Sequence, residues 1–204
     1  MESASQLKSR ARRLESAGDF EEALELYEKA LRRSAGDPDA MPDPTLQLRV
    51  ADLHYRLERP GLALSEYERA AELYRELGLM VNAIAVWKKV ARVYEDAPHP
   101  NRRLAELQLA MGLVADGRSS LRTFVEGCAG TDREEQAVEA MVEFLRASPD
   151  PEIATLLARW LGGRGSPPEA AVETLERTRR RLEDEGRAAA EFEQAMEEIL
   201  GPST

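Results

Sequence analysis

The most constraining feature of the sequence is the segment 18–31, which has the pattern of a turn followed by an amphipathic helix. Gly18 can adopt the positive φ that ends a preceding helix, and the carboxylate of Asp19 can cap the next one. The apolar residues of the segment share one helical face, and they are Ala23, Leu24, Tyr27, Ala30 and Leu31. Because a lone helical hairpin cannot bury such a face, the segment predicts further hairpins that stack on it.

Helical patterns of the same kind continue through the first 130 residues. The predicted helices cover 4–17, 20–33, 46–57, 60–77 and 80–96, followed by one that starts after a cap at Asn101 and one that ends at Gly127. Thr45 is the expected cap of the 46–57 helix. The segment 34–44 is rich in proline, aspartate and glycine, so it is expected to be a loop. Two interpretations of this loop stay open, a tolerated insertion and a functional lip.

An internal repeat organises these helices. A triplet of small, large and small residues occurs twice, forty residues apart, as Ala23, Tyr27, Ala30 and as Ala63, Tyr67, Ala70. The 34–44 loop accounts for the excess over a period of 34, and the segment that starts at Ala71 recurs 34 residues later, starting at Ala105. Since Ala63 and Ala83 are only 20 residues apart, the 60–77 helix is expected to serve two neighbouring hairpins.

The 34-residue period and the triplet that follows Gly18, Asp19 and Phe20 resemble the tetratricopeptide repeat over about residues 4–128. The resemblance implies an all-α fold, a right-handed α-solenoid of tetratricopeptide-like helical hairpins with C-terminal capping helices and a long terminal helix. It is specific for the fold rather than for the function.

The last third of the chain is predicted to be helical without a clear repeat. Capping boxes are expected at Thr131 with Glu134 and at Ser166 with Glu169. The predicted domains are a helical repeat domain over 1–130, an additional hairpin over 131–165, and a long polar C-terminal helix over 166–204.

Two roles are open for the polar helix, which is expected to run over 167–200 with a narrow apolar stripe that Gly186 interrupts. It either caps the open end of the solenoid or forms a homo-oligomer or binds a partner through its stripe.

The charge balance excludes some classes of partner. The chain has a net charge of −10, and residues 131–204 contribute −8 of it, which disfavours a nucleic-acid-binding protein because such proteins need a cationic face. No apolar run approaches the roughly 18 residues of a membrane span, and the first residues lack the layout of a secretory signal. A single cysteine, Cys128, rules out an internal disulfide framework and fits a cytoplasmic location. The arginine-, alanine- and glycine-rich composition is compatible with a bacterial source.

The residues needed for catalysis are scarce. The chain has two histidines, His54 in a predicted helix and His99 between two prolines, and neither has a sequence neighbour that forms a metal or nucleophile motif. Cys128 lies near no histidine in sequence. We therefore expect no metal, no cofactor and no enzymatic activity.

Binding of a protein or peptide is the remaining function class. In solenoids of this kind the first helix of each hairpin lines a concave wall. Helical phase and the resemblance together assign to this wall Lys8, Arg12, Asp52, Tyr55, Glu72, Arg75, Arg102 and Glu106. The wall has charges of both signs, and Lys8 has no asparagine beside it, so a clamp for a C-terminal carboxylate is not implied. The main hypothesis is a non-catalytic adaptor that binds a peptide or partner helix in the groove, and the alternative is a homo-oligomerisation module built on residues 167–200.

Overall fold

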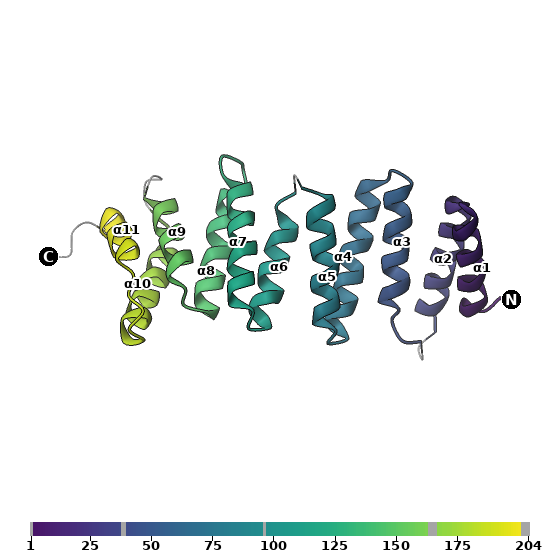
Figure 1. Cartoon of the computed structure of the whole chain (residues 1–204), viewed down its shortest axis with the longest axis horizontal. Helices are drawn as coiled ribbons and strands as arrows, with labels where there is room; N and C mark the ends of the chain where they lie inside the picture. Colours follow the sequence, from purple (N-terminus) through teal and green to yellow (C-terminus); the bar gives the residue numbers. More distant parts are fainter. Residues whose placement is uncertain (1, 38–39, 96, 163–166, 201–204) are drawn as a thin grey trace. The chain divides into compact units, whose positions relative to one another are not determined.

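The computed structural model describes residues 2–37, 40–95, 97–162 and 167–200, and within these ranges the chain forms α-helices joined by turns, with no strand (Figure 1). The helices fall into two compact units, which divide after Val93. Unit 1 contains α1 (Ala4–Ala17), α2 (Phe20–Ala35), α3 (Pro44–Arg56), α4 (Pro60–Glu76) and α5 (Met80–Val93). The all-α class of stacked helical hairpins is confirmed.

Unit 2 contains the remaining helices, which are α6 (His99–Ala110), α7 (Val114–Cys128), α8 (Glu134–Ala147), α9 (Pro151–Leu161), α10 (Glu169–Asp184) and α11 (Ala190–Leu200). The division after Val93 differs from the predicted boundary at residue 130. The compact units are groups of mutually packed helices, and the assignment of domains to 1–130, 131–165 and 166–204 stays a prediction.

In unit 1, the α1–α2 and α4–α5 turns each contain a glycine with positive φ, Gly18 and Gly78. Gly18 has φ +91°, and its N–H donates to the carbonyl oxygen of Glu15 at 3.1 Å, as the sequence predicted. Two predicted caps in unit 1 are wrong. The Asp19 side chain makes no capping hydrogen bond, and Asp43 rather than Thr45 caps α3, because its carboxylate accepts from the N–H of Leu46 at 2.9 Å.

The core of unit 1 contains the repeated triplet. Tyr27 and Tyr67 are buried between their flanking alanines, which are fully covered. The small alanine side chains let neighbouring helices approach closely, and each tyrosine ring fills the space beyond. α4 packs against both α3 and α5, which confirms that it is shared by two hairpins.

Unit 2 begins with α6 and α7, on which α8 packs. α9 then packs on α8, α10 packs on α8 and α9, and α11 packs on α9. Two predicted helix starts in this unit are wrong. α6 begins at His99, before the expected cap at Asn101, and α8 begins at Glu134 without a capping box, since the Thr131 hydroxyl accepts from the N–H of Arg133 instead. The expected cap Ser166 lies outside the described residues.

The predicted single helix over 167–200 is also wrong, because the chain turns between α10 and α11. Gly186 has φ +66°, and the N–H of Arg187 donates to the carbonyl oxygen of Leu182 at 2.7 Å, which closes the end of α10. The turn folds the apolar stripe of both helices into the core of unit 2. Its buried members include Leu175, Leu182, Phe192 and Met196. These two helices therefore cover the core of unit 2, as the capping interpretation predicted.

Candidate functional site

A groove with an apolar floor lies on unit 2 among α6, α7 and α8, and its volume is about 490 Å³. Its floor is formed by the buried residues Ala105, Leu121, Ala140 and Phe144. Leu109 and Val114, which are partly buried, line its sides. Its edge carries Arg102, Glu106 and Glu143, of which the first two belong to the wall predicted from the sequence.

The groove stays open because many of its lining side chains are too short to fill it. Four alanines line it, together with Gly112, and two of these alanines, Ala110 and Ala147, are exposed at its mouth. Beneath it, Gly117 lets α7 lie close to α6, since a Cβ at this position would be 3.3 Å from the carbonyl oxygen of Ala105. Gly117 lies inside α7.

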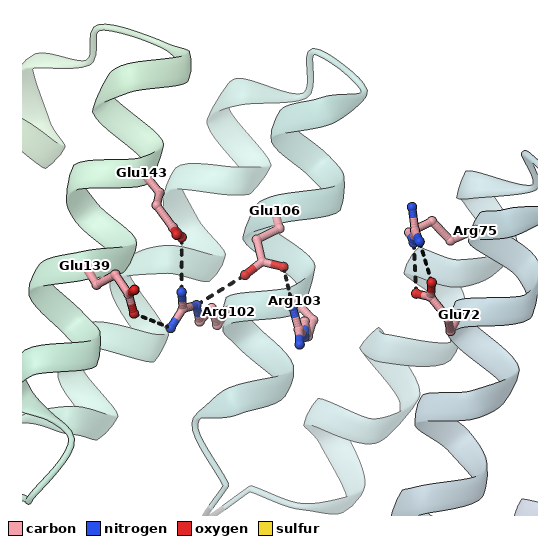
Figure 2. Close-up of polar contacts among 7 residues, drawn as sticks. All are labelled: Glu72, Arg75, Arg102, Arg103, Glu106, Glu139 and Glu143. Atoms are coloured by element: carbon pink, nitrogen blue, oxygen red, sulfur yellow. Dashed lines mark hydrogen bonds and ion pairs between the residues drawn. The ribbon is translucent and has the colours of Figure 1, made fainter.

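The polar edge of the groove is organised around Arg102 (Figure 2). Its guanidinium donates to Glu106 of α6 at 3.2 Å, and to Glu139 and Glu143 of α8 at 3.3 and 3.1 Å. Arg103 donates to the other oxygen of Glu106 at 2.9 Å.

The protonation of Arg102 follows from these contacts. Burial lowers the pKa of Arg102, but the attraction of Glu143, Glu106 and Glu139 outweighs it and raises the pKa overall. The side chain, 23% exposed, therefore stays charged and joins the facing surfaces of α6 and α8.

Sequence reasoning missed the part of this edge that α8 supplies. Glu139 and Glu143 follow Arg102 and Glu106 by 37 residues each, so they occupy corresponding places on the first helices of successive hairpins. This spacing was the available signal. It went unused because residues 131–165 show too little of the small-large-small triplet to be recognised as a repeat.

In unit 1, several predicted wall residues are bound within the chain. Lys8 of α1 donates to the carboxylate of Asp43 at 3.0 Å, across to the start of α3. The Arg12 side chain is exposed and makes no hydrogen bond or ion pair with any residue in the described ranges. Tyr55 is 46% exposed on α3. The predicted wall of unit 1 therefore offers one unpaired cation and one exposed aromatic ring.

Two carboxylates of unit 1 have the same arrangement of partners. The Tyr67 hydroxyl donates to Asp52 at 2.6 Å, and Lys89 of α5 pairs with the same carboxylate. One hairpin earlier, the Tyr27 hydroxyl donates to Glu15 at 3.0 Å, and the guanidinium of Arg49 lies 3.2 Å from that carboxylate. Each set joins three helices, so Asp52 stabilises the stack rather than facing solvent as a free charge.

The pKa of Tyr27 reflects the first of these sets. Burial, followed by the hydrogen bond to the carboxylate of Glu15 and its charge, raises the pKa of Tyr27 to about 12.

The last two predicted residues lie together on α4. Arg75 donates to Glu72 at 2.8 Å through Nε and through a second nitrogen, which makes a bidentate pair on an exposed helix face (Figure 2). Both residues belong to unit 1, whereas Arg102 and Glu106 belong to unit 2. The eight predicted residues are thus distributed over both units, and the groove brings together only the pair on α6.

The titratable residues that catalysis needs are not assembled in the described ranges. His54 is buried with Nε2 3.5 Å from Glu28, and its Nδ1 has no hydrogen-bond partner among the described residues. Cys128 is buried, and burial raises the pKa of its thiol. Within the same ranges, no cluster of three metal-ligating side chains is found. None of the described helices has the length and hydropathy to span a bilayer.

Several solved structures resemble the chain at low sequence identity. The nearly identical TPR-like repeats assigned to a kinesin light chain of Podosopora anserina are 21% identical over 98% of this chain and 95% of theirs, with a TM-score of 0.38. The Rap conjugation gene regulator of plasmid pLS20, in complex with the Phr* peptide, is 16% identical over 98% of this chain and 59% of its own, with a TM-score of 0.37. BtubC of P. vanneervenii is 18% identical over 98% of this chain and 82% of its own, with a TM-score of 0.36.

No curated protein matches the chain. The tetratricopeptide repeat family matches residues 4–76, which span α1 to α4. This segment contains both copies of the alanine–tyrosine–alanine triplet. Residues 4–76 of the chain therefore belong to the tetratricopeptide repeat family.

Proposed function

We propose that the protein is a non-catalytic scaffold that binds a peptide or helix of a partner protein in the groove formed by α6, α7 and α8. The observation that carries the proposal is an apolar groove of about 490 Å³ with charged residues at its edge. This volume lies within the range of roughly 300–1,000 Å³ that is typical of ligand sites. Fold and family alone indicate a surface for protein interactions, and the groove supplies a specific place for one.

The groove suits a side chain that inserts from a partner. Burying a leucine or phenylalanine side chain contributes about 1.5–3 kcal/mol, and the floor of Ala105, Leu121 and Phe144 offers the apolar contacts for it. The ion pairs from Arg102 hold α6 and α8 in place before binding. A preformed wall of this kind leaves most of the ordering cost to the ligand.

The unit 1 residues of the predicted wall remain part of the proposal, with unequal roles. Arg12, which is unpaired, and Tyr55, which is an exposed aromatic side chain, are the ones suited to contact a partner directly. Lys8, Asp52, Glu72 and Arg75 would first have to leave partners within the chain. Their net contribution to binding is therefore expected to be small.

Homo-oligomerisation through residues 167–200 has less support than partner binding. The apolar stripe that would form such an interface packs into the core of unit 2. A cytoplasmic location and a bacterial source are proposed on the single buried cysteine and the composition of the chain.

The experiment is affinity capture from a lysate of the source organism with a variant that fills the groove. Ala147 is an exposed lining residue at the end of α8, so Ala147→Trp places an indole in the groove without overpacking the core. Ala115→Trp is the matched control, because Ala115 is exposed on α7 and does not line the groove. We expect the wild-type chain and the control to retain the same partners and Ala147→Trp to lose them. Equal recovery by all three proteins would contradict the proposal.

A further inference from the structure

We infer that the ligand of the α6–α8 groove is a basic amphipathic segment of another protein, which inserts an apolar side chain and pairs its lysine or arginine residues with Glu139 and Glu143. The inference rests on the proposed function and specifies the class of partner. It is carried by charge complementarity at three levels: the unit, the groove edge and individual oxygen atoms.

The first level is the charge of the two units. Residues 94–204 contain 22 acidic residues and 13 arginines, a net charge of −9, whereas residues 1–93 contain 16 acidic and 15 basic residues, a net charge of −1. The groove therefore belongs to the strongly acidic part of the chain. The negative electrostatic potential around an acidic unit attracts cationic ligands and repels anionic ones as they approach.

The second level is the groove edge itself. The guanidinium of Arg102 contacts three carboxylates, those of Glu106, Glu139 and Glu143, and Arg103 contacts Glu106 alone among them. The edge thus keeps one negative charge in excess. Arg102 donates to all three carboxylates, so an acidic ligand could reach it only by displacing one of them and placing its own negative charge beside the other two.

The third level is the set of oxygen atoms that remain available. Glu139 and Glu143 each use Oε2 to accept from Arg102, and their Oε1 atoms accept no hydrogen bond from the rest of the described chain. The two residues are one turn apart on the same face of α8, and both side chains are more than half exposed. Two cationic side chains of one ligand helix, also one turn apart, match this spacing.

A second copy of the chain does not have the required character. Its α6–α8 region would bring the same excess of negative charge, and unit 1 is close to neutral. The floor of the groove excludes a purely ionic ligand, since Ala105, Leu121 and Phe144 offer no hydrogen-bonding side chain. An apolar anchor flanked by cations satisfies both the floor and the edge.

The test begins with selection of peptides from a random library displayed on phage, using the full chain as bait. Enriched peptides are then synthesised with a fluorescent label, and their affinities are measured by anisotropy at low and high salt. The rim variant is Glu139→Gln/Glu143→Gln. Its control, Glu169→Gln/Glu173→Gln, removes the same charge from exposed positions with the same spacing on α10.

We expect enriched peptides to contain lysine or arginine around an apolar residue. The rim variant should weaken their binding by about 2- to 30-fold, as for two exposed ion pairs, and salt should weaken it further. The α10 control should change the affinity less than twofold. Ala147→Trp should abolish binding, and Ala115→Trp should not.

Two results would overturn different parts of the account. Enrichment of acidic or uncharged peptides that Ala147→Trp no longer binds would refute the inferred ligand class and leave the groove function intact. Enriched peptides that bind Ala147→Trp as well as the wild type would refute the groove as the site. Equal losses of peptide affinity in the rim variant and the α10 control would show that only the overall negative charge of unit 2 attracts the ligand. This result would also contradict the inference.

Discussion

Replacement of Phe192 by alanine tests whether the C-terminal helices are part of the unit 2 core. Phe192 is fully buried on α11, within the same apolar cluster as residues of α7, α8 and α9. Removing a buried phenylalanine side chain lowers the free energy of unfolding by about 3–5 kcal/mol, because apolar burial is lost and a cavity remains. Because a whole domain is stable by only about 5–15 kcal/mol, this change should remove a large fraction of the stability of unit 2.

The chain contains a suitable reporter for this measurement. Trp160 of α9 packs against the same cluster, and the other tryptophan, Trp87, lies on α5 in unit 1. Urea unfolding followed by fluorescence in a Trp87→Phe background therefore reports on unit 2. Gln194→Ala, an exposed position on α11, is the control and should change the free energy of unfolding by no more than about 0.5 kcal/mol.

The result that would refute this reasoning is an unfolding midpoint for Phe192→Ala equal to that of Gln194→Ala. A midpoint that rises with protein concentration would indicate that α11 is stabilised by a second copy. Either outcome would restore the oligomerisation hypothesis for residues 167–200.

Three further changes test the local structure, each by urea or thermal unfolding. Gly18→Ala should lower the free energy of unfolding by about 1–2 kcal/mol, because Gly18 has φ +91°. Gly61→Ala, in an open helical position, should raise the free energy of unfolding by about 0.4–1 kcal/mol. Equal effects of the two substitutions would contradict the turn geometry. Tyr27→Phe should cost about 1–2 kcal/mol at pH 7. Since the pKa of Tyr27 is raised to about 12, the difference in stability between the wild type and Tyr27→Phe should be complete below about pH 10 and vanish as the pH rises through 12. A difference in stability that persists above this pH would refute the hydrogen bond to Glu15. Gly117→Leu should lower the free energy of unfolding by about 1–3 kcal/mol through overpacking against α6, and Gly117→Ala by less; an unchanged stability of Gly117→Leu would contradict the close contact.

The sequence predicted the helices of unit 1 well because their signals are local. The face that contains Ala23, Tyr27 and Ala30 recurs, and glycine marks the turns at Gly18 and Gly78, both of which have positive φ. A helical period together with a residue suited to positive φ determines an element without knowledge of its neighbours.

Helix starts were predicted less well because capping depends on the backbone conformation of one residue. Asp43 and Thr45 are both good capping residues two positions apart, and Asp43 caps the helix while Pro44 and Thr45 form its first turn. Gly186 was recognised as an interruption of the last helix, but the sequence did not reveal that the chain reverses there. That reversal is stabilised by the burial of Phe192 and Met196 against α9, a tertiary effect.

The candidate site was the least predictable part. Helical phase placed Arg102 and Glu106 correctly on one face of α6, but it could not show that Arg102 is enclosed by carboxylates of α8. The same limit applies to Lys8, which helical phase assigned to a binding wall and which pairs with Asp43. Ion pairs between helices depend on interhelical distances, and a period along one helix carries no information about them.

The most direct test of the central claim is hydrogen–deuterium exchange of the full chain with and without a partner captured by the wild-type protein. We predict slower exchange along α6 and the C-terminal half of α8, around the groove lined by Ala105, Ala140 and Phe144, and no such change in Ala147→Trp. Protection confined to other helices, with α6 and α8 unchanged by the bound partner, would contradict the claim that this groove is the binding site.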